Sequence, residues 1–387
     1  MSRPKPRQFL LDASRLIWRL WTGRLPTGVD RVCLEYVRQF GSRSQAVLQF
    51  RGRVAVLSPR DSDRLFALLL DGGPRVRQRL VALAATAWPK ARRAPPRGGM
   101  IYQNVGHTGL HDPALPKWIA AYGVKAVYLI HDLIPIRHPD FCRDGEAGKH
   151  SRRMENALRS SRGIIGNSQT TVDDMAAFAK ERALPMPASL AAWIGSGQTL
   201  SGVIPRTLDR PYFITVGTIE ARKNHLLLLR IWRELVDEMG DSAPTLVIVG
   251  QRGWKAEAAE AILDHSGELR EHVRELSKCG DEDLAAWLKG ARALLMPSFV
   301  EGFGLPIVEA FAYGTPVIAS DLPVYREIVG DIPTYADAGD YEGWKAAILA
   351  FVSDGPERQR QKRMLEGYSM PGWPSHFASV EQWLQTL

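Results

Sequence analysis

The segment from Pro297 to Ser320 contains residues whose types and spacing suit the binding of an anion. It follows an apolar run and reads PSFVEGFGLPIVEAFAYGTPVIAS. Pro306 suits the first turn of a helix, so Gly302 and Gly304 are expected just before a helix N-terminus, where backbone N–H groups lack intrahelical partners. Glycine lets an oxyanion approach the backbone closely, and the helix dipole attracts phosphate. The segment therefore predicts a phosphate site.

Two carboxylates flank this loop. Glu301 precedes it and Glu309 follows eight positions later, inside the first turns of the expected helix, so both can face one crevice. One carboxylate can then accept hydrogen bonds from sugar hydroxyls while the other holds a ribose diol. The expected binding residues here are Gly302, Phe303, Gly304, Leu305 and Glu309, with Glu301 beside the reacting group. The alternative is a glycine-rich turn before a core helix whose glutamates are solvated.

A second segment, YFITVGTIEARKNHLLLL from Tyr212 to Leu229, supplies cations. Its strand is expected to end at Gly217 and its helix to begin near Asn224. At the carboxyl end of a parallel strand, Arg222 and Lys223 project into the crevice where α/β sheets bind ligands, and they can neutralise a departing diphosphate. The alternative is a pair of solvent-facing basic residues at a helix start.

The N-terminal half offers two weaker candidates. In AVYLIHDLIPIRHP, His131 stands at the end of a buried strand, where it can bind a sugar hydroxyl or be satisfied by local hydrogen bonds. In RLPTGVDRV, Gly28 allows close backbone contact with a ligand, although a plain helix start at Thr27 fits nearly as well. Ser168 in GNSQTT is expected to cap a helix.

Together these segments resemble the signature of the family 4 retaining glycosyltransferases of GT-B fold, and the chain is similar to bacterial mannosyltransferases of surface polysaccharide assembly. The resemblance implies that Glu301 contacts the donor sugar, Glu309 the nucleotide ribose and Lys223 the diphosphate. It also implies that Gly217 lies at the donor and that His131 contacts the transferred sugar. Many members have an arginine directly after the glycine, where this chain has Thr218.

Metal-dependent transferases of the other major fold type use an Asp-x-Asp pattern, which Asp61, Ser62 and Asp63 reproduce. Here the pattern does not follow a hydrophobic strand, so a helix N-terminus is the preferred interpretation. No cluster of metal-ligating residues is evident elsewhere. Neither a metal nor a cofactor is therefore expected, and a nucleotide-diphosphate sugar is the expected donor.

The alternation of short apolar runs with helical spacing predicts two doubly wound parallel-sheet domains, and the GT-B resemblance implies that they face each other across a cleft. A Pro-, Gly- and Ser-rich stretch, 184–211, is the expected linker. It separates an acceptor-side domain (1–200) from a nucleotide-sugar domain (205–368), and a C-terminal helix (369–387) is expected to pack back on the first. Predicted strands are Gln8–Asp12, Gly99–Asn104, Ala126–His131, Gly163–Asn167, Tyr212–Val216, Thr245–Gly250, Ala293–Met296 and Pro316–Ala319.

The charge of the chain is unevenly distributed. Residues 1–200 hold 31 lysines and arginines against 15 acidic residues, and the remainder hold 19 against 27. The basic half suits an anionic surface such as a membrane leaflet. No apolar run reaches the roughly 18 residues that cross a bilayer, so a cytoplasmic enzyme is expected, in possible contact with the inner face of the plasma membrane.

The expected reaction is transfer of a hexose, with mannose from GDP-mannose as the guess, to a saccharide or polyprenyl-diphosphate-linked acceptor in polysaccharide or lipopolysaccharide assembly. Two alternatives stay open. One is a sugar phosphorylase of the same fold, and the other is a nucleic-acid-binding protein that uses the basic half. The second lacks a recognisable nucleic-acid-binding signature, so nucleic acid is not an expected partner.

Overall fold

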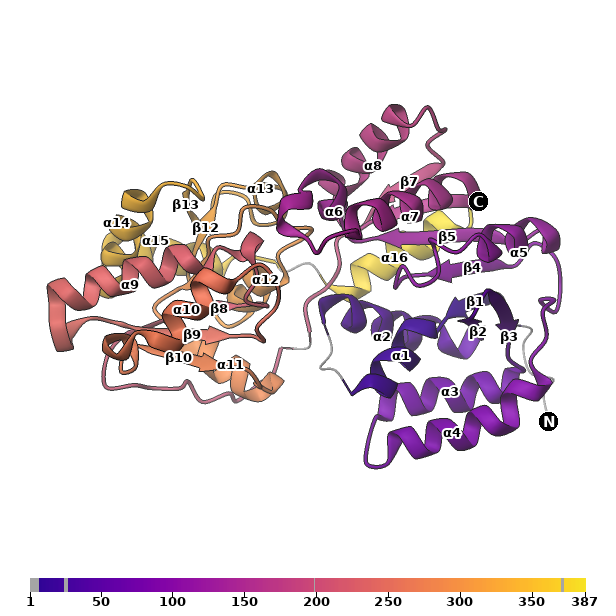
Figure 1. The fold of residues 1–387 in the computed structure, drawn as a ribbon, viewed down its shortest axis with the longest axis horizontal. Coiled ribbons are helices and arrows are strands. Elements are labelled where there is room, and N and C mark those ends of the chain that lie inside the picture. Colours follow the sequence, from indigo (N-terminus) through magenta and orange to yellow (C-terminus); the bar gives the residue numbers. More distant parts are fainter. Residues whose placement is uncertain (1–6, 24–26, 198, 370–371) are drawn as a thin grey trace. The chain divides into compact units, whose positions relative to one another are not determined.

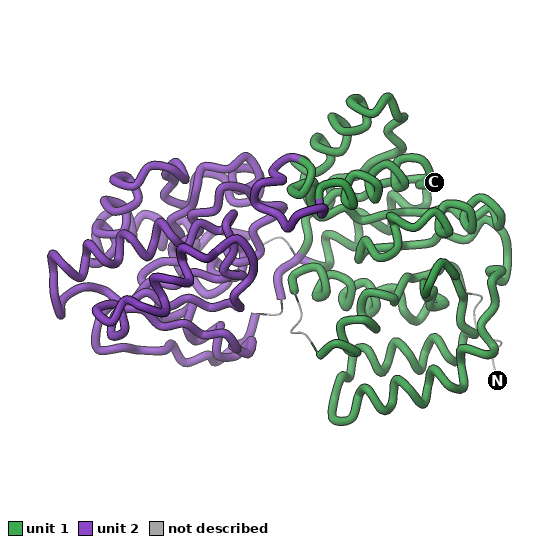
Figure 2. The backbone as a smooth tube through the Cα atoms, viewed as in Figure 1, with its two compact units in different colours: residues 1–136, 147–194, 373–387 green, residues 137–146, 195–372 purple. Residues whose placement is uncertain are grey.

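Two parallel β-sheets, each in its own unit, organise the chain. The computed structural model describes residues 7–23, 27–197, 199–369 and 372–387. Clustering of contacts divides the protein into a first unit of residues 1–136, 147–194 and 373–387 and a second unit of residues 137–146 and 195–372, as Figure 2 shows.

The first sheet has seven strands in the order β3-β2-β1-β4-β5-β6-β7, all parallel except the β2–β3 pair. The order reverses direction between β1 and β4, and α/β sheets bind ligands beyond the carboxyl ends of their strands at such a point. The strands are β1 Phe9–Asp12, β2 Ser44–Phe50, β3 Arg53–Val56, β4 Ile101–Asn104, β5 Lys125–Ile130, β6 Ser161–Gly166 and β7 Ala188–Ala191.

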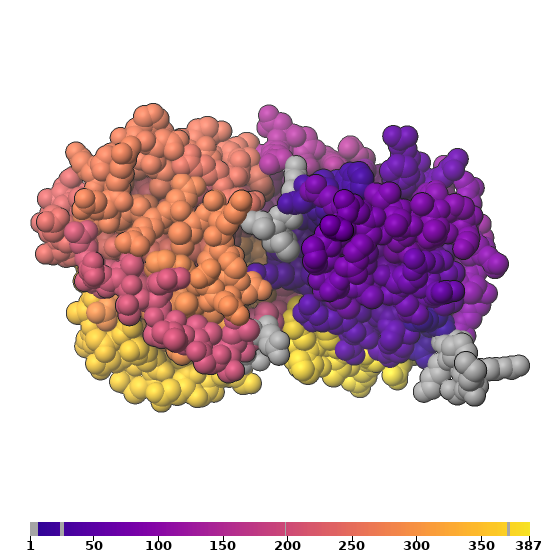
Figure 3. Space-filling view, turned by 90° about the horizontal axis from the view of Figure 1, so that it is seen from below, coloured from indigo at the N-terminus to yellow at the C-terminus, as the bar shows by residue number. Residues whose placement is uncertain are grey.

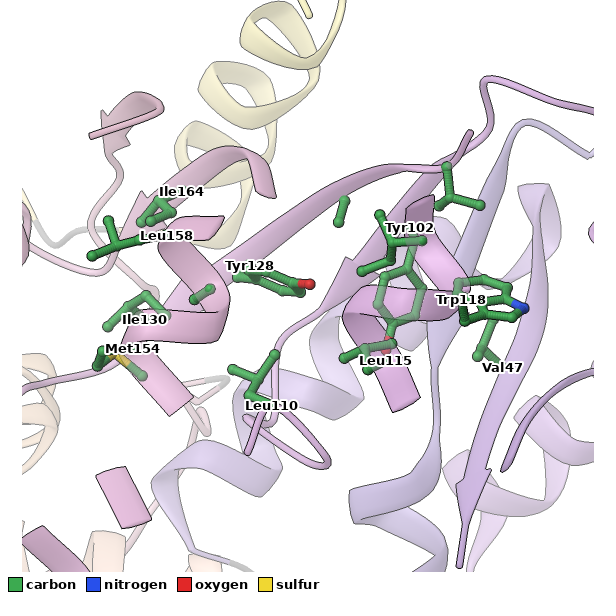
Figure 4. Close-up of a cluster of buried hydrophobic side chains, with 14 of the residues drawn as sticks. Val47, Tyr102, Leu110, Leu115, Trp118, Tyr128, Ile130, Met154, Leu158 and Ile164 are labelled. Atoms are coloured by element: carbon green, nitrogen blue, oxygen red, sulfur yellow. The ribbon is translucent and has the colours of Figure 1, made fainter. Parts of the chain in front are cut away.

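Helices flank this sheet (Figure 1). Figure 4 shows part of the core, in which Tyr102, Tyr128 and Trp118 pack with aliphatic side chains from neighbouring strands and helices. In the view of Figure 3, α3 and α4 form much of the near surface of this unit. The helices are α1 Ser14–Thr22, α2 Gly28–Phe40, α3 Pro59–Asp71, α4 Val76–Ala87, α5 Ala114–Tyr122, α6 Ile134–Arg137, α7 Glu146–Ser160, α8 Gln169–Glu181 and α16 Trp373–Leu384.

The second sheet has six strands in the order β10-β9-β8-β11-β12-β13, with every neighbouring pair parallel and the reversal between β8 and β11. Its strands are β8 Tyr212–Val216, β9 Thr245–Val249, β10 Val273–Leu276, β11 Leu294–Met296, β12 Val317–Ser320 and β13 Thr334–Ala336. Its helices are α9 His225–Met239, α10 Glu257–His265, α11 Asp281–Gly290, α12 Leu305–Ala312, α13 Pro323–Val329, α14 Tyr341–Val352 and α15 Pro356–Glu366.

The two sheets confirm the predicted fold class. All eight predicted strands are present with ends shifted by at most two residues, and five further strands, β2, β3, β7, β10 and β13, were missed. Within the described residues, no helix is long and apolar enough to cross a membrane.

The predicted domain limits need two corrections. The first unit ends at Ile194 rather than at residue 200, because β7 lies inside the predicted linker and pairs with β6. The segment 137–146 belongs to the second unit, because Phe141 stacks on Phe299 at 5.2 Å and accepts a hydrogen bond from the indole of Trp254.

The C-terminal helix α16 belongs to the first unit. Tyr36 of α2 and His376 of α16 share a buried hydrogen bond of 2.9 Å, and Phe377 packs edge-on against Tyr36. Val380 is fully buried on the same helix. The apolar face of α16 therefore joins the core of the N-terminal half, about 340 positions away in sequence.

Candidate functional site

The two loops that the sequence singles out meet at the strand-order reversal of the second sheet. β8 and β11 are neighbours through Ile214 and Leu294, and each is followed by one of the loops. The amide of Phe299 donates a 2.8 Å hydrogen bond to the carbonyl of Arg222, which ties the loops together. The topology thus brings side chains almost 80 positions apart to one place, as expected for an α/β ligand site.

A buried network of charges fills this place. Lys223 Nζ lies 2.5 Å from Glu301 Oε1, and Arg222 Nη1 lies 2.8 Å from Glu301 Oε2. Arg222 Nε also pairs with Glu220 at 2.6 Å, and the hydroxyl of Ser298 donates to Glu301 at 2.8 Å. The Lys223 side chain is 10% exposed and that of Glu301 7%. The alternative prediction, in which Arg222 and Lys223 both face solvent, is therefore wrong for Lys223.

The charge states follow from burial and pairing. Burial alone would raise the pKa of Glu301, but Arg222 and Lys223 outweigh it and hold this pKa at about 2. Burial also raises the pKa of Glu220 and lowers that of Lys223, in each case opposed by the oppositely charged neighbours. Glu301 is thus an anion at neutral pH, fixed between two cations.

Glu301 retains limited capacity to bind a further donor. Each carboxylate oxygen has two lone-pair positions. Oε1 accepts from Lys223 and Ser298, whereas Oε2 has Arg222 as its partner. One acceptor position on Oε2 is left for a donor such as a sugar hydroxyl.

The glycine-rich loop before α12 has the backbone conformation that the predicted anion site requires. α12 begins at Leu305 after Gly304, which has φ +98° and offers no capping side chain. A Cβ on Gly304 would lie 2.6 Å from the ring of Tyr325, so the position has neither the space nor the conformation for another residue. Pro306 has no N–H and the Ile307 amide donates to the carbonyl of Gly304 at 2.9 Å, so a ligand at this helix start would meet the Leu305 amide and the positive end of the helix dipole.

The other residues predicted for this loop differ in exposure. Phe303 is buried, so its side chain belongs to the core and only its backbone suits ligand binding. Leu305 and Glu309 are half-buried, at the start and in the second turn of α12. Their contact with a nucleotide remains a prediction.

Gly217 has a role that the sequence does not reveal. It has φ +146°, and a Cβ there would lie 3.1 Å from Cε and 3.3 Å from Nζ of Lys223. The missing side chain therefore makes room for the lysine to cross the end of β8 toward Glu301. Thr218, which stands where similar proteins often have arginine, is half-buried.

The corresponding edge of the first sheet carries neutral histidines. His131 follows β5, is buried, and its Nε2 donates a 2.8 Å hydrogen bond to the carbonyl of Val105. Burial lowers its pKa to about 4. A neutral ring that donates through Nε2 presents Nδ1 as an acceptor, which suits a hydroxyl group.

Sequence reasoning missed the neighbours of His131. The ring of His107 lies 5.1 Å from that of His131 and 5.9 Å from that of His150. His107 has φ +59°, a rare conformation for this residue type, and its Nε2 donates to the carbonyl of Leu129. No sequence motif indicates this arrangement. His107 follows β4, His131 follows β5 and His150 lies on α7, so the three rings come together only in the folded protein.

The loop around Gly28 is partly outside the described residues, which omit 24–26. Gly28 is the first residue of α2, and Thr27 and Asp30 form a capping box there. Asp30 also pairs with Arg15 at 2.6 Å and Arg19 at 2.8 Å. This geometry is the plain helix start at Thr27 that the sequence left open, and ligand contact at Gly28 remains a prediction.

The structure confirms two minor predictions about helix starts. Ser168 caps α8 by accepting from the Thr171 amide, as predicted. Asp61 lies in the first turn of α3, where it bonds to the Ser58 hydroxyl, so the Asp-x-Asp pattern is a helix N-terminus. Among the described residues, no group of three or more His, Cys, Asp or Glu side chains is arranged to hold a metal ion.

Glu220, Ser298 and Tyr325 are further site residues that the sequence did not identify. Glu220 lies two positions before Arg222, and Ser298 three before Glu301, so their closeness in sequence was an available signal. Tyr325 packs against Gly304 from α13, twenty-one positions later, and only the fold reveals it.

Comparisons with known proteins identify the region that carries this site. Residues 198–365 match the family model described as "Glycosyl transferases group 1". The serotype-specific mannosyltransferase WbdA of Escherichia coli is 30% identical over 231 residues, which are 56% of this chain and 28% of WbdA. The O-antigen chain mannosyltransferase B of the same species is 36% identical over 148 residues, 38% of either chain. The chain thus spans well under half of these relatives.

Solved structures agree with the fold over nearly the whole chain. The crystal structure of Anabaena Alr3699/HepE in complex with UDP and glucose matches 98% of this chain and 99% of its own, with a TM-score of 0.67 and 13% identity. Sucrose-phosphate synthase from Thermosynechococcus elongatus covers 98% of both chains with a TM-score of 0.62 and 15% identity. At these identities the likeness concerns the fold alone.

Proposed function

We propose that this protein, whose residues 198–365 are a domain of the glycosyl transferases group 1 family, is a retaining glycosyltransferase that uses a nucleotide-diphosphate sugar. The observation that carries the proposal is the buried pairing of Lys223 and Arg222 with Glu301, beside a helix N-terminus that begins at Gly304. Fixed cations and amides at one place suit a diphosphate leaving group, because charge grows there as the sugar departs.

The proposed reaction is a displacement at the anomeric carbon. The bond from this carbon to the diphosphate oxygen breaks and its electron pair leaves with the nucleoside diphosphate. The acceptor hydroxyl bonds to the same face of the carbon, and its proton passes to the departing diphosphate oxygen. Lys223, Arg222 and the amides of Gly302 to Gly304, directly before α12, stabilise the growing negative charge.

The remaining predicted residues receive roles consistent with their geometry. Glu301 accepts a sugar hydroxyl through its remaining Oε2 position, and Glu309 accepts from the nucleotide ribose. Neutral His131 accepts a substrate hydroxyl through Nδ1. Two further residues, Leu276 at the end of β10 and Ser277 directly after it, are assigned to the nucleotide base through their backbone groups.

Mannose from GDP-mannose is the proposed sugar, and a saccharide or polyprenyl-diphosphate-linked acceptor the proposed partner. Similarity to mannosyltransferases of O-antigen assembly supports this choice. We infer that the protein works at the inner face of the plasma membrane, and the excess of basic residues in 1–200, which suits anionic lipid, supports this location.

A donor panel tests the proposal. We expect GDP-mannose to raise the melting temperature more than UDP-, ADP- or dTDP-sugars, because a ligand that binds only the native state stabilises it. Incubation with a mannose-terminated acceptor should then release GDP and extend the acceptor with an α-linkage. Formation of mannose 1-phosphate from inorganic phosphate would instead identify a phosphorylase, and failure of every donor to bind would contradict the proposal.

A further inference from the structure

An apolar cavity of about 600 Å³ lies in the first unit. It is lined by Trp18 and Trp21 of α1, Phe50 at the end of β2, Val81 and Ala84 of α4, and Trp88 directly after α4. No charged side chain belongs to its lining, which contains only three polar residues among the described side chains.

Several of the large apolar side chains that line the cavity are exposed to solvent. The described residues leave eleven large hydrophobic side chains exposed, and five of them line this cavity. Trp21 is 56% exposed, Phe50 59% and Val81 52%. Single exposed hydrophobic residues are ordinary, but a contiguous apolar hollow of this kind marks a binding site.

The polar residues of the lining connect the cavity to the strand end where the first sheet reverses. Gln49 lines the cavity and donates hydrogen bonds to Asp12, at 2.8 Å, and to the carbonyl of Thr108, at 2.9 Å. Asp12 is the last residue of β1. One part of the cavity thus adjoins the edge at which an α/β sheet binds its ligand.

Three cations lie close in sequence or in space to residues of the lining. Arg51 is exposed and stacks on Phe50 with its guanidinium 5.3 Å from the ring. Arg77 lies one turn before Val81 on the same face of α4 and donates to the carbonyl of Leu20 at the end of α1. Lys90 follows Trp88 by two positions. An apolar hollow with a basic rim complements a molecule that joins a hydrocarbon chain to an anionic group.

We propose that this cavity holds the hydrocarbon chain of an anionic lipid whose phosphate meets Arg51, Arg77 or Lys90. The inference rests on the proposed function in one respect, since such a lipid is the carrier of the sugar acceptor. The tryptophans suit this role, because their rings combine a large apolar surface with a polar N–H and favour the boundary between hydrocarbon and water.

A chain-length series tests the proposal with the full-length protein. Hexyl, octyl and decyl phosphate, each below its micelle concentration, are titrated by calorimetry. We expect binding to strengthen about fourfold for each added methylene while the chain fits the cavity. Octanol should bind more weakly than octyl phosphate, because it lacks the anion. Equal affinity across the series, or binding only to vesicles of anionic lipid, would overturn the proposal.

Two variants locate the binding. Val81→Asp places a carboxylate in the lining at a half-exposed position, and Ala84→Phe fills the space. Each should weaken octyl phosphate binding at least tenfold. Leu70→Asp is the matched control, because Leu70 is an exposed side chain of α3 outside the lining, and it should bind like the wild type.

Failure of the cavity proposal can be distinguished from failure of the proposed enzyme activity. Lys223→Ala removes a proposed catalytic cation of the second unit, so it should bind octyl phosphate as the wild type does. Chain binding without sugar transfer would leave the cavity assignment standing and contradict the enzyme. Wild-type affinity in both Val81→Asp and Ala84→Phe, with unchanged melting temperatures, would overturn the assignment.

Discussion

The two units share a strand order but differ in the chemistry at the point where that order reverses. In the second unit this edge holds Lys223, Arg222 and Glu301 in a buried ion-pair network. In the first it holds Asp12 and the neutral ring of His107, with His131 on the next strand. The same topology therefore supports an ion-pair network in one unit and a hydrogen-bonding site with neutral histidines in the other.

This difference determines which chemical groups the edge of each sheet can bind. A diphosphate needs fixed positive charge, which the second unit supplies close to helix amides. A sugar hydroxyl needs a hydrogen-bond acceptor, which a histidine with a low pKa supplies without adding charge. Topology determines where a ligand binds, and the side chains that the loops deliver determine which ligand it is.

The largest effect is expected from Lys223→Ala. Loss of the ammonium removes stabilisation of the leaving group and leaves Glu301 with one cation, so kcat/KM should fall by about 10³-fold. Steady-state assays with the preferred donor measure this. Lys345→Ala is the matched control, because Lys345 also pairs with two carboxylates, Glu234 and Glu238, but lies on α14. Comparable losses in both variants would contradict a special role for Lys223.

Gly304→Ala should have the next largest effect. The new Cβ would meet Tyr325 at 2.6 Å in a backbone conformation with φ +98°, so we expect about 2–3 kcal/mol of destabilisation and at least tenfold weaker donor binding. Gly314→Ala separates the two causes, since Gly314 has φ +70° and nothing within 4 Å of the added Cβ. Urea melts should show a loss of only about 1 kcal/mol there, with donor affinity unchanged.

His131 gives a smaller effect with a pH signature. Burial holds its pKa at about 4, below the 6.5 of an unperturbed histidine. The unfolded chain thus binds more protons between pH 6.5 and 4, and the free energy of unfolding falls as the pH is lowered through this window. His131→Gln should reduce that fall by about 1 kcal/mol or more and lower kcat by roughly tenfold at pH 7. An unchanged pH profile of stability would show that the histidine is not held neutral.

The smallest effect is expected from Glu309→Gln, which weakens a hydrogen bond to the nucleotide ribose. GDP should bind about tenfold more weakly to this variant. A 2′,3′-dideoxy analogue of GDP should bind the wild type and the variant equally, because it lacks the hydroxyls concerned. A difference that persists with the analogue would place Glu309 elsewhere in the site.

The sequence predicted the second unit better than the first. The segments β8–α9 and β11–α12 were located, with strand ends within one residue, because buried strands, a glycine-rich turn and a proline at a helix start are local signals. The strands that were missed carry weaker local sequence signals. β10 is four residues long with the charged Arg274 and Glu275 at its centre, and β7 lies among the prolines and glycines assigned to the linker.

The parts that sequence could not predict depend on contacts between distant segments. Segment 137–146 joins the second unit through Phe141, whose partner Phe299 is 158 positions later. The sequence predicted that Lys223 and Glu301 lie in the same crevice. Only the folded structure shows that they are in direct contact, at 2.5 Å. The apolar cavity combines α1, β2 and α4, none of which alone indicates a binding site.

The central claim is that Lys223 and its neighbours bind a diphosphate, and a double comparison of affinities tests it most directly. Calorimetry with GDP and GMP, on the wild type and on Lys223→Ala, isolates the contribution of the second phosphate. The account predicts that GDP binds the wild type at least tenfold more tightly than GMP and that this ratio falls to near one in the variant. An equal ratio in both proteins would contradict it.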